Sequence, residues 1–590
     1  MQQEIWKAIE QALEELGVAD AAFVVERPGD LSHGDYATNA AMVGFASYQD
    51  IQKNFHNLEK RKQVQPIVNR DGFEWKIPKE LAENLKLKLQ DKIGGVSKIE
   101  IAGPGFINFF LSQEAIVKEV EKISANEALS ILSDFTGKTV LVEYTSPNLF
   151  KPLHIGNLIG NILGESITRI LEASGANVKR INYPSDIGLT VAKGVWGIRK
   201  NNFDPNDIAQ LGQAYVLGNA AYEEDEDAKK EIEIINKALY EGDPELTLVR
   251  EAGIKTSLRH LEELCQTLGT AFDATFFESQ TAPLGRDIVA QYVTDGIFEK
   301  SEGAVVYKGE EEGLHTRVFL NSQGLPTYEA KDIGLFSLKQ RAYPQFDASI
   351  TVTGSEQKDY FKVVFAAIRK VFTEETDGKL LMHVANGFLR LTIGKMSSRK
   401  GNVITGESLL MGLKDAAKEK MEGRTLKDHE KTAQQVAVGA IKYAVLKQGR
   451  GKDIIFDPEK SLSLEGDSGP YVQYAYTRAL SLLRKAEAEG LLAKGEAWPS
   501  GLERPESATL PLERTLIHFS EVVAHAAAEL EPHYITTYLT ELASLFNSWY
   551  ANERIIGGKH PEYGVLLVQA FANTMQKGLM LLGIPAPEEM

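Results

Sequence analysis

The distribution of apolar and polar positions along the chain predicts a parallel sheet. The run 139–144 is apolar and rich in β-branched residues, as expected for a buried strand. Residues 158–173 then carry apolar side chains at helical spacing, and Gly175 provides a stop. A second strand-like run, 178–183, follows, so the unit is strand, helix, strand with a right-handed crossover. Because ligands of such sheets bind where strands end and helices begin, the loop 146–157 is the first candidate site.

The same pattern predicts the second half of the sheet further along the chain. Residues 351–354 end a strand before the helix of Gln357, and residues 382–391 form the last strand. Between the two halves, residues 196–263 are helical and form an insertion. We therefore expect an α/β fold with a doubly wound, parallel, Rossmann-type catalytic domain.

The flanking segments have a different character, which divides the chain into domains. Residues 1–112 alternate one helical pattern with several strand-like runs and predict a small α/β domain. After about residue 436 nearly everything follows the 3.6-residue period of a helical bundle. The expected divisions are an N-terminal domain at 1–112, a helical linker at 113–134, the catalytic domain at 135–405 with its insertion near 196–263, and a helical domain at 406–590.

Composition agrees with a large enzyme and excludes some classes of site. The chain has 590 residues, of which 43% are hydrophobic, enough for several cores. A single cysteine, Cys265, excludes intrachain disulfides and a Cys-rich zinc module. We expect no protein-bound zinc and assign no residue to a metal site. The sequence predicts neither a membrane span nor a signal peptide, which favours the cytoplasm.

Charge alone leaves a nucleic-acid partner open. The net charge of −17 argues against one, but only the field at the docking face matters. In the stretch 391–452, Lys and Arg outnumber Asp and Glu. This stretch can face a phosphate backbone, although a solvated basic helix surface explains the composition equally well.

The loop after the first strand has the chemistry of a phosphate site. The helix that begins near Gly156 directs unpaired N–H groups and the positive end of its dipole toward an anion. His154 and Lys151 can donate hydrogen bonds to phosphate oxygens. The alternative is an ordinary strand-to-helix turn with an incidental His and Lys.

A second loop, residues 394–402, strengthens the phosphate hypothesis. It has glycines at both ends, two hydroxyls, no acid, and three cations, Lys395, Arg399 and Lys400. Mutual repulsion of the cations disfavours packing of the loop by itself, so it suits a mobile clamp for pyrophosphate.

The two loops together resemble the signatures of class I aminoacyl-tRNA synthetases, in the form found in arginyl-tRNA synthetases. The first is Ser-Pro-Asn at 146–148 with Lys-Pro-Leu-His-Ile-Gly at 151–156, and the second is Gly-Lys-Met-Ser-Ser-Arg-Lys-Gly at 394–401. Further stretches that resemble the same family lie at 33–39, 103–108 and 469–475.

This resemblance implies an ATP-dependent ligase that attaches L-arginine to tRNA(Arg), with Mg²⁺ accompanying the ATP. It also implies that the N-terminal domain touches the outer corner of the tRNA and that the helical domain reads the anticodon. We expect a monomer. Aromatic residues of the helical domain suit base stacking, although aromatics at helical spacing are more often core; they are Tyr471, Tyr474, Tyr476, Trp549 and Tyr550.

The amino-acid site needs carboxylates and an aromatic wall, because a guanidinium presents five N–H donors in one plane. Residues 277–280 lie in a strand-like setting, and 326–332 open a helix. Alone, each acid is more often a solvated surface group. The resemblance implies that the guanidinium is held by Glu278, Tyr328 and Asp332, that the α-amino and carboxylate end is held by Asn148 and Gln357, and that Glu143 and Ser146 lie near that end.

For the nucleotide, the resemblance implies that His154 stabilises the α-phosphate in the transition state. It also implies that the second loop binds the leaving pyrophosphate. Positioning and charge neutralisation should provide most of the rate acceleration. The catalytic cations expected are Lys151, Lys395 and Lys400, with His154; the ATP contacts expected are His154, Gly156, Asn157, Lys395, Met396, Ser397 and Ser398.

Two positions depart from the family pattern. Asn157 stands where a second His is usual, and Ser398 stands where a second Lys is common. One alternative is a degenerate synthetase that only binds tRNA, in which both changes would be lesions of the catalytic site. A class I synthetase for another amino acid would lack paired acids, and a small-molecule nucleotidyltransferase would not need the C-terminal helices.

Overall fold

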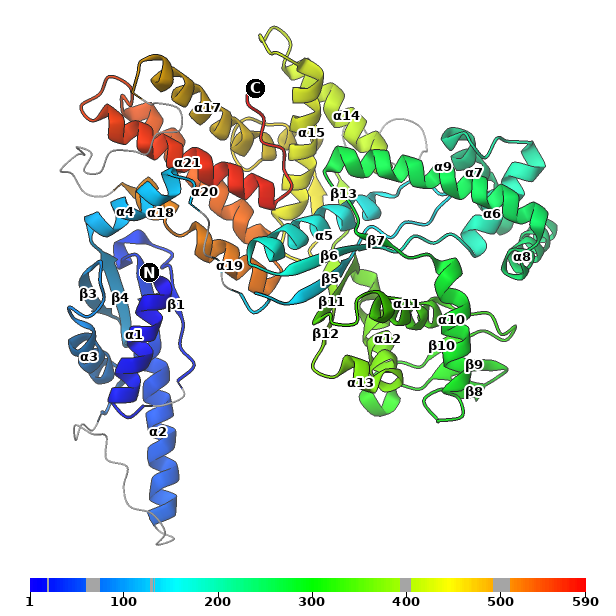
Figure 1. The fold of residues 1–590 in the computed structure, drawn as a ribbon, viewed down its shortest axis with the longest axis horizontal. Coiled ribbons are helices and arrows are strands. Elements are labelled where there is room, and N and C mark those ends of the chain that lie inside the picture. The colour runs from blue at the N-terminus through cyan, green and yellow to red at the C-terminus, as the bar shows by residue number, and fades with distance from the viewer. Residues whose placement is uncertain (19–20, 60–74, 128–130, 132, 393–404, 492–509) are drawn as a thin grey trace. The chain divides into compact units, whose positions relative to one another are not determined.

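The computed structural model describes residues 1–590 except 19–20, 60–74, 128–130, 132, 393–404 and 492–509 (Figure 1). The described residues form two compact units. One comprises Met1–Leu129, Ala479–Glu521 and Ser544–Thr574, and the other comprises Ser130–Arg478, Val522–Ala543 and Met575–Met590.

The first unit contains a four-stranded antiparallel sheet in the order β1-β2-β4-β3. One apolar face of this sheet packs against helices, whose side chains Ile5, Ile9, Leu81 and Leu85 are fully buried. These elements are α1 (Gln2–Glu15), β1 (Val25–Glu26), β2 (Tyr36–Thr38), α2 (Ala40–Glu59), α3 (Pro78–Leu89), β3 (Val96–Ala102) and β4 (Phe106–Leu111).

The loop around His33 is a structural turn. Asp35 is buried, and its carboxylate accepts hydrogen bonds from the Leu111 amide at 2.8 Å and from Arg514 Nε at 2.6 Å. His33 is exposed at the end of a short 3₁₀ turn. Asp35 therefore joins the N-terminal sheet to α18 (Pro511–Leu516) within this unit.

The second unit is built on a five-stranded parallel sheet in the order β12-β11-β5-β6-β7, which confirms the Rossmann-type prediction. Val140, Leu141 and Val142 of the central strand are fully buried, as their β-branched and aliphatic character predicts. The strands are β5 (Thr139–Glu143), β6 (Asn177–Asn182), β7 (Ala274–Thr275), β11 (Ala348–Gly354) and β12 (Leu380–Asn386), and α5 (Ile155–Ala173) connects β5 with β6.

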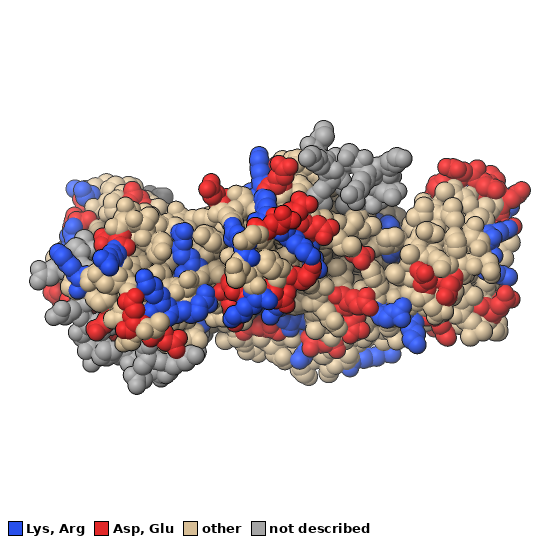
Figure 2. Space-filling view, turned by 90° about the horizontal axis from the view of Figure 1, so that it is seen from above, with Lys and Arg blue, Asp and Glu red and all other residues tan. Residues whose placement is uncertain are grey.

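The insertion forms four helices beside this sheet (Figure 1). Exposed acids at 223–227 lie where α7 ends and α8 begins. Figure 2 shows acidic side chains gathered at the right-hand end of the molecule, over these helices. The helices are α6 (Leu189–Asn201), α7 (Ile208–Glu224), α8 (Glu226–Glu241) and α9 (Pro244–Leu268).

Helices α10 (Glu278–Gln291) and α11 (Tyr328–Ala342) pack at unusually close range. A Cβ atom on Gly285 would overlap the carbonyl oxygen of Ala330, and one on Gly334 would overlap that of Thr281. Only glycine permits this approach, which fixes the start of one helix against the other. In the sequence, a small antiparallel sheet separates α10 from α11; its strands are β8 (Glu299–Ser301), β9 (Ala304–Tyr307) and β10 (Arg317–Leu320). Helices α12 (Lys358–Val371) and α13 (Thr373–Thr376) follow β11.

The remaining elements are mainly helical, as predicted. Tyr476 is buried in the core, Tyr474 lies under the Arg478 guanidinium, and Tyr550 stacks on Phe546. The elements are α4 (Gln113–Ser124), β13 (Leu389–Leu391), α14 (Gly406–Lys420), α15 (His429–Leu446), β14 (Ile454–Phe456), α16 (Pro458–Ser461), α17 (Gly469–Ala488), α19 (Phe519–Glu529), α20 (His533–Asn552) and α21 (Pro561–Leu581).

Three local predictions were wrong. Residues 277–280 are not strand-like, because Glu278 begins α10. The expected strand 382–391 is divided: β12 ends at Asn386, and β13 pairs with β14 outside the main sheet. The helix of the expected linker ends at Ser124, since Asn126 has a φ of 57°.

In the described part of the chain, no helix is long and apolar enough to cross a lipid bilayer.

Candidate active site

The first signature lies where β5 ends and α5 begins. His154 is the N-cap of α5, and its Nδ1 accepts a hydrogen bond from the Gly156 amide at 3.1 Å. Nδ1 therefore carries no proton, and in the neutral ring the proton is on Nε2. Burial, and then the charge of Lys151, lower the pKa of His154, which favours this neutral form. The imidazole is left with one N–H donor that faces away from the helix.

The backbone before His154 is strained. Thr145, Ser146 and Phe150 have φ values of 73°, 37° and 68°, in the left-handed region that non-glycine residues rarely adopt. Asn157 Nδ2 donates to the Thr145 carbonyl at 2.9 Å and so holds this bend. The departure at 157 thus has a structural use: the amide fixes the loop that precedes the signature.

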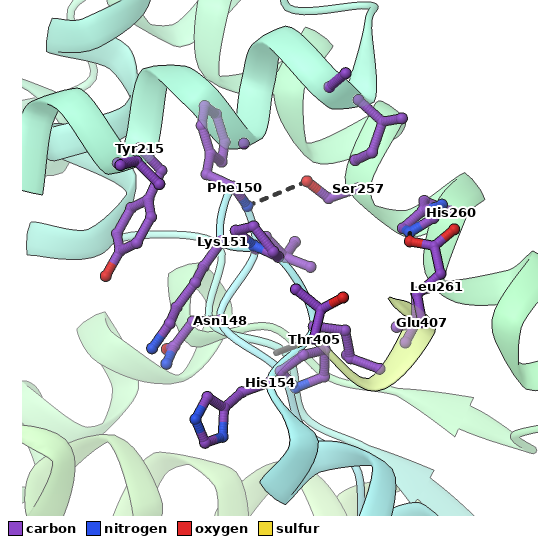
Figure 3. Close-up of a pocket in the computed structure, with 18 of the residues that line it drawn as sticks. Asn148, Phe150, Lys151, His154, Tyr215, Ser257, His260, Leu261, Thr405 and Glu407 are labelled. Carbon is purple, nitrogen blue, oxygen red and sulfur yellow. Dashed lines mark hydrogen bonds and ion pairs between the residues drawn. The ribbon is translucent and has the colours of Figure 1, made fainter. Parts of the chain in front are cut away.

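The polar side chains of the loop share one side of it. Figure 3 shows the ends of Asn148 and Lys151 on the same side as the His154 ring, whereas Phe150 points toward the insertion helices. The Phe150 amide donates to Ser257 Oγ of α9 at 3.1 Å, and Lys151 Nζ lies 6.0 Å from the Tyr215 ring centre. Beside the loop is a cavity of about 950 Å³, lined by these residues and by α7 and α9.

The second signature lies outside the described residues, together with Lys395, Met396, Ser397, Ser398 and Lys400. The residues that follow it are described. The Gly406 amide donates to the Leu153 carbonyl at 3.1 Å, and Thr405 forms an antiparallel bridge with His154. Thr405 and Gly406, which follow the second signature in the sequence, thus lie directly beside the first.

The three predicted acids come from different elements and lie near one another. Burial, followed by the charges of Glu278, Asp332 and Glu143, raises the pKa of Tyr183 well above its usual value. Tyr183 follows β6, and its hydroxyl lies 2.6 Å from Thr281 Oγ1. The three acids are close enough to one buried tyrosine to affect its pKa. Glu143 and Glu278 are buried and Asp332 is half-buried, so the solvated-surface alternative does not apply to them.

Two of these acids are paired with buried lysines. Lys331 Nζ lies 2.5 Å from Glu278 Oε2, and Lys339 Nζ lies 2.5 Å from Glu143 Oε2. All four side chains are at most 7% exposed. Burial alone would lower the pKa of Lys331, but Glu278 beside it holds that pKa above the usual value.

The third acid has a different partner. Asp332 Oδ2 accepts a hydrogen bond from the Tyr360 hydroxyl at 2.6 Å, and its side chain is partly accessible. Burial, then the charge of Glu143, raises the pKa of Asp332 to about 8, against the lowering effects of Tyr360 and Lys339. In the part of the chain that the structure describes, no cation is bonded to this carboxylate.

The other predicted contacts surround this pocket less closely. Tyr328 is 60% exposed, and its ring lies 5.0 Å from Lys331 Nζ. Ser146 Oγ accepts from the Tyr183 amide at 3.2 Å. Asn148 and Gln357 are exposed beyond the carboxyl ends of β5 and β11, which are neighbouring parallel strands, so both lie at the binding edge of the sheet.

Sequence reasoning missed the two lysines and Tyr360. Lys331 lies three residues after Tyr328 and directly before Asp332, so helical spacing already placed it on the pocket side of α11. Lys339 lies seven residues after Asp332 and so on the same side of α11, but its partner Glu143 is 196 residues away and gave no signal in the sequence.

The described residues contain no group of three His, Cys, Asp or Glu side chains that could hold a metal ion. Cys265 is buried, and burial raises the pKa of its thiol to about 12.

Three family models match the chain. Residues 3–111 match the arginyl tRNA synthetase N terminal domain, residues 119–458 match the catalytic domain of class I tRNA synthetases (R), and residues 472–590 match the DALR anticodon binding domain.

Full-length relatives agree. An arginine–tRNA ligase of Clostridium perfringens is 29% identical, with 92% of this chain and 98% of the relative covered, and one of Clostridium botulinum strain 657 is 32% identical, with 87% and 91% covered. The arginyl-tRNA synthetase structure from Thermus thermophilus is 26% identical and covers both chains fully with a TM-score of 0.77. The Plasmodium falciparum structure has the same fold, with a TM-score of 0.77 at 20% identity and 100% and 99% of the two chains covered. The chain therefore belongs to the arginyl-tRNA synthetase family, the arginine–tRNA ligases of class I.

Proposed function

We propose that the chain charges tRNA(Arg) with L-arginine in two steps at the edge of its parallel sheet. In the first step the arginine carboxylate attacks the α-phosphorus of ATP, giving arginyl-adenylate and pyrophosphate. In the second step a terminal ribose hydroxyl of the tRNA displaces AMP. Neither step needs a protein nucleophile, so positioning and charge neutralisation provide the acceleration.

The observation that carries this proposal is the gathering of three acids at α11: Glu278 and Glu143 are bonded to Lys331 and Lys339 of this helix, which also carries Asp332. A cationic, planar side chain suits a pocket with several carboxylates, since each N–H can reach an acceptor. Glu278 and Asp332 are proposed to hold the guanidinium, with the Tyr328 ring as one wall. Asn148, Gln357 and Ser146 are proposed to bind the α-amino and carboxylate end, near Glu143.

His154 is proposed to act on the α-phosphate as a neutral donor. Because Nδ1 is occupied by the Gly156 amide, Nε2–H is the group available to the phosphate. A donor aimed at charge that develops in the transition state lowers the barrier, whether or not the ring is charged. Gly156 permits close approach of the nucleotide, and Asn157 holds the loop.

Positive charge near the leaving group is proposed to come from Lys151, Lys395 and Lys400, with Met396, Ser397 and Ser398 completing the ATP contacts. Support for the second-signature residues comes from the bridge between His154 and Thr405, since Thr405 follows that signature closely in the sequence. Mg²⁺ bound to the ATP would neutralise further phosphate charge. No step is assigned to zinc.

We also propose the division of labour among the domains: tRNA contact by residues 1–112, a linker at 113–134, catalysis by 135–405, and stem and anticodon contact by 406–590. The protein is proposed to work as a monomer in the cytoplasm. The match of residues 472–590 to an anticodon binding domain supports the assignment of anticodon contact to 406–590.

The test is exchange of pyrophosphate into ATP with each of the twenty amino acids, with and without tRNA(Arg). The expected result is exchange with arginine and with no other amino acid. This exchange should appear or rise when tRNA(Arg) is added. Exchange with a different amino acid would contradict the arginine site. No exchange with any amino acid, combined with tight tRNA binding, would favour a tRNA-binding protein that has lost catalysis.

A further inference from the structure

The candidate arginine pocket holds more charged groups than a substrate cation requires. Its acids are Glu143, Glu278 and Asp332, and its internal cations are Lys331 and Lys339. Each lysine is bonded to one glutamate at 2.5 Å. The pairing leaves Asp332 as the acid without a cationic partner among the described residues.

Several elements around Asp332 contribute a charged or titratable group. Strand β5 contributes Glu143, α10 contributes Glu278, and the residue after β6 is Tyr183. Helix α12 contributes Tyr360, whose ring also lies 5.2 Å from the Arg317 guanidinium; Arg317 is paired with Glu329 at 3.1 Å. On α11 itself the neighbours are Lys331 and Lys339, both already bonded to glutamates.

A single unpaired carboxylate in such surroundings is poorly solvated as an anion and is stabilised by a proton. The Tyr360 hydroxyl donates to Oδ2, which leaves Oδ1 as the oxygen that can carry this proton. A guanidinium N–H donor directed at Oδ1 competes with this proton, because the ionised carboxylate is a much stronger acceptor than the protonated carboxyl.

We propose that Lys331 and Lys339 set the charge of this pocket to accept one cation, and that arginine binding expels the proton of Asp332. The inference rests on the proposed arginine site. The balance is simple: the O–H bond of the Asp332 carboxyl breaks, the proton leaves to water, and the carboxylate forms a charge-assisted bond with the incoming guanidinium. Lys331 and Lys339 are positioning residues, since they act through Glu278 and Glu143.

A neutral side chain of similar shape gains nothing from this exchange. Such a ligand cannot replace the charge of the lost proton, so it must bind the protonated form through weaker neutral hydrogen bonds. Selection for a monovalent cation thus follows from the number of acids that the lysines leave unpaired.

The experiment is calorimetric titration of L-arginine into the full-length protein, in buffers of differing ionisation enthalpy. With the pKa of Asp332 at about 8, roughly 0.9 proton is released per arginine at pH 7 and about half a proton at pH 8. Over the same range the Kd falls as the pH rises, by about 50-fold between pH 6 and pH 8.

Asp332→Asn provides the first check. It cannot carry the proton, so the variant should bind arginine more weakly, with no proton release and a Kd independent of pH between 6 and 8. The matched control is Asp287→Asn, at an exposed carboxylate of α10 that pairs with Arg286. The control should release as many protons as the unaltered protein.

Lys331→Met tests the positioning role. Loss of this cation leaves Glu278 unpaired beside Asp332, so the pH at which proton release is half maximal should move upward. Lys362→Met, at an exposed α12 lysine paired with Asp359, should leave that pH unchanged. Thermal unfolding of each variant establishes that it is folded.

Arginine binding with less than about 0.2 proton released at pH 7 and a Kd that does not change with pH would overturn the inference while leaving the arginine site in place. An unchanged midpoint in folded Lys331→Met would overturn the positioning role. No arginine binding at any pH, with tRNA present or absent, would overturn both the inference and the proposed function.

Discussion

The signature loop and the acid pocket lie at the same edge of the parallel sheet, yet they are held together in different ways. The loop is one continuous segment, and its bonds are local: His154 caps its own helix, and Asn157 binds the Thr145 carbonyl. The pocket draws its groups from β5, α10, α11 and α12, and its ion pairs join residues as far as 196 positions apart.

This difference in construction matches a difference in chemistry. The loop presents exposed donors to a ligand that brings its own negative charge, so it needs little internal compensation. The pocket buries acids that must be compensated before the substrate arrives, and lysines provide that compensation. A change in the loop should therefore alter the rate, and a change in the pocket should alter arginine affinity.

The largest expected effect is that of His154→Ala on the rate. Loss of one donor aimed at the developing charge should lower kcat for arginyl-adenylate formation by about 10²–10³, with little change in arginine affinity. Pyrophosphate exchange measures the rate and equilibrium dialysis measures affinity. His260→Ala, at a histidine of α9 paired with Glu407, is the control and should retain most of the rate. A His154→Ala protein with normal kcat would remove the imidazole from the reaction.

Asp332→Ala should produce the opposite pattern. Removal of the carboxylate should raise the Kd for arginine by about 10²-fold, because a charge-assisted bond in a partly buried site is lost. ATP affinity should change little, since ATP is assigned to the loop. Unchanged arginine binding would exclude this residue from the pocket, and equal losses for both ligands would mean that loop and pocket are not separable.

Gly334→Ala should weaken the pocket indirectly. The added Cβ would overlap the Thr281 carbonyl and push α11 away from α10, which separates Lys331 and Asp332 from Glu278. We expect a loss of about 1–3 kcal/mol in the free energy of unfolding, together with about tenfold weaker arginine binding. Chemical denaturation and equilibrium dialysis measure the two effects. Gly212→Ala, on α7 with Pro152 Cγ 3.4 Å from the new atom, is the matched helical control and should be at least as stable as the parent.

The last prediction concerns stability and pH. The folded protein binds a proton at Asp332 up to about pH 8, whereas the unfolded chain releases it near pH 4, so this residue destabilises the fold increasingly as pH rises through that range. Asp332→Asn removes the penalty. Its Tm relative to the parent should therefore be higher at pH 9 than at pH 5, as measured by scanning calorimetry without ligands. A constant difference would indicate that Asp332 titrates at its ordinary pKa.

The same contrast explains what the sequence could and could not predict. The unit β5, α5, β6 was predictable because its apolar period, its stop at Gly175 and its signature are all contiguous. Glu278 was misplaced on a strand because Phe276 and Phe277 precede it, although the Gln280 side chain, bonded to the Phe277 amide at 3.0 Å, starts a helix there.

Pairing over long distances was not predictable at all. Nothing local indicates that Leu389–Leu391 leaves the main sheet to pair with Ile454–Phe456, or that Lys339 neutralises Glu143. Such partners are selected by the tertiary fold. The acids of the pocket could be named in advance, but the acid that remains without a cation could not.

The most direct test of the whole account is a crystal structure of the full-length protein with a non-hydrolysable analogue of arginyl-adenylate. We predict a phosphate oxygen within hydrogen-bond distance of His154 Nε2, and the guanidinium on Asp332 and Glu278. An analogue bound with its phosphate away from His154, or with its guanidinium outside the three acids, would contradict the account.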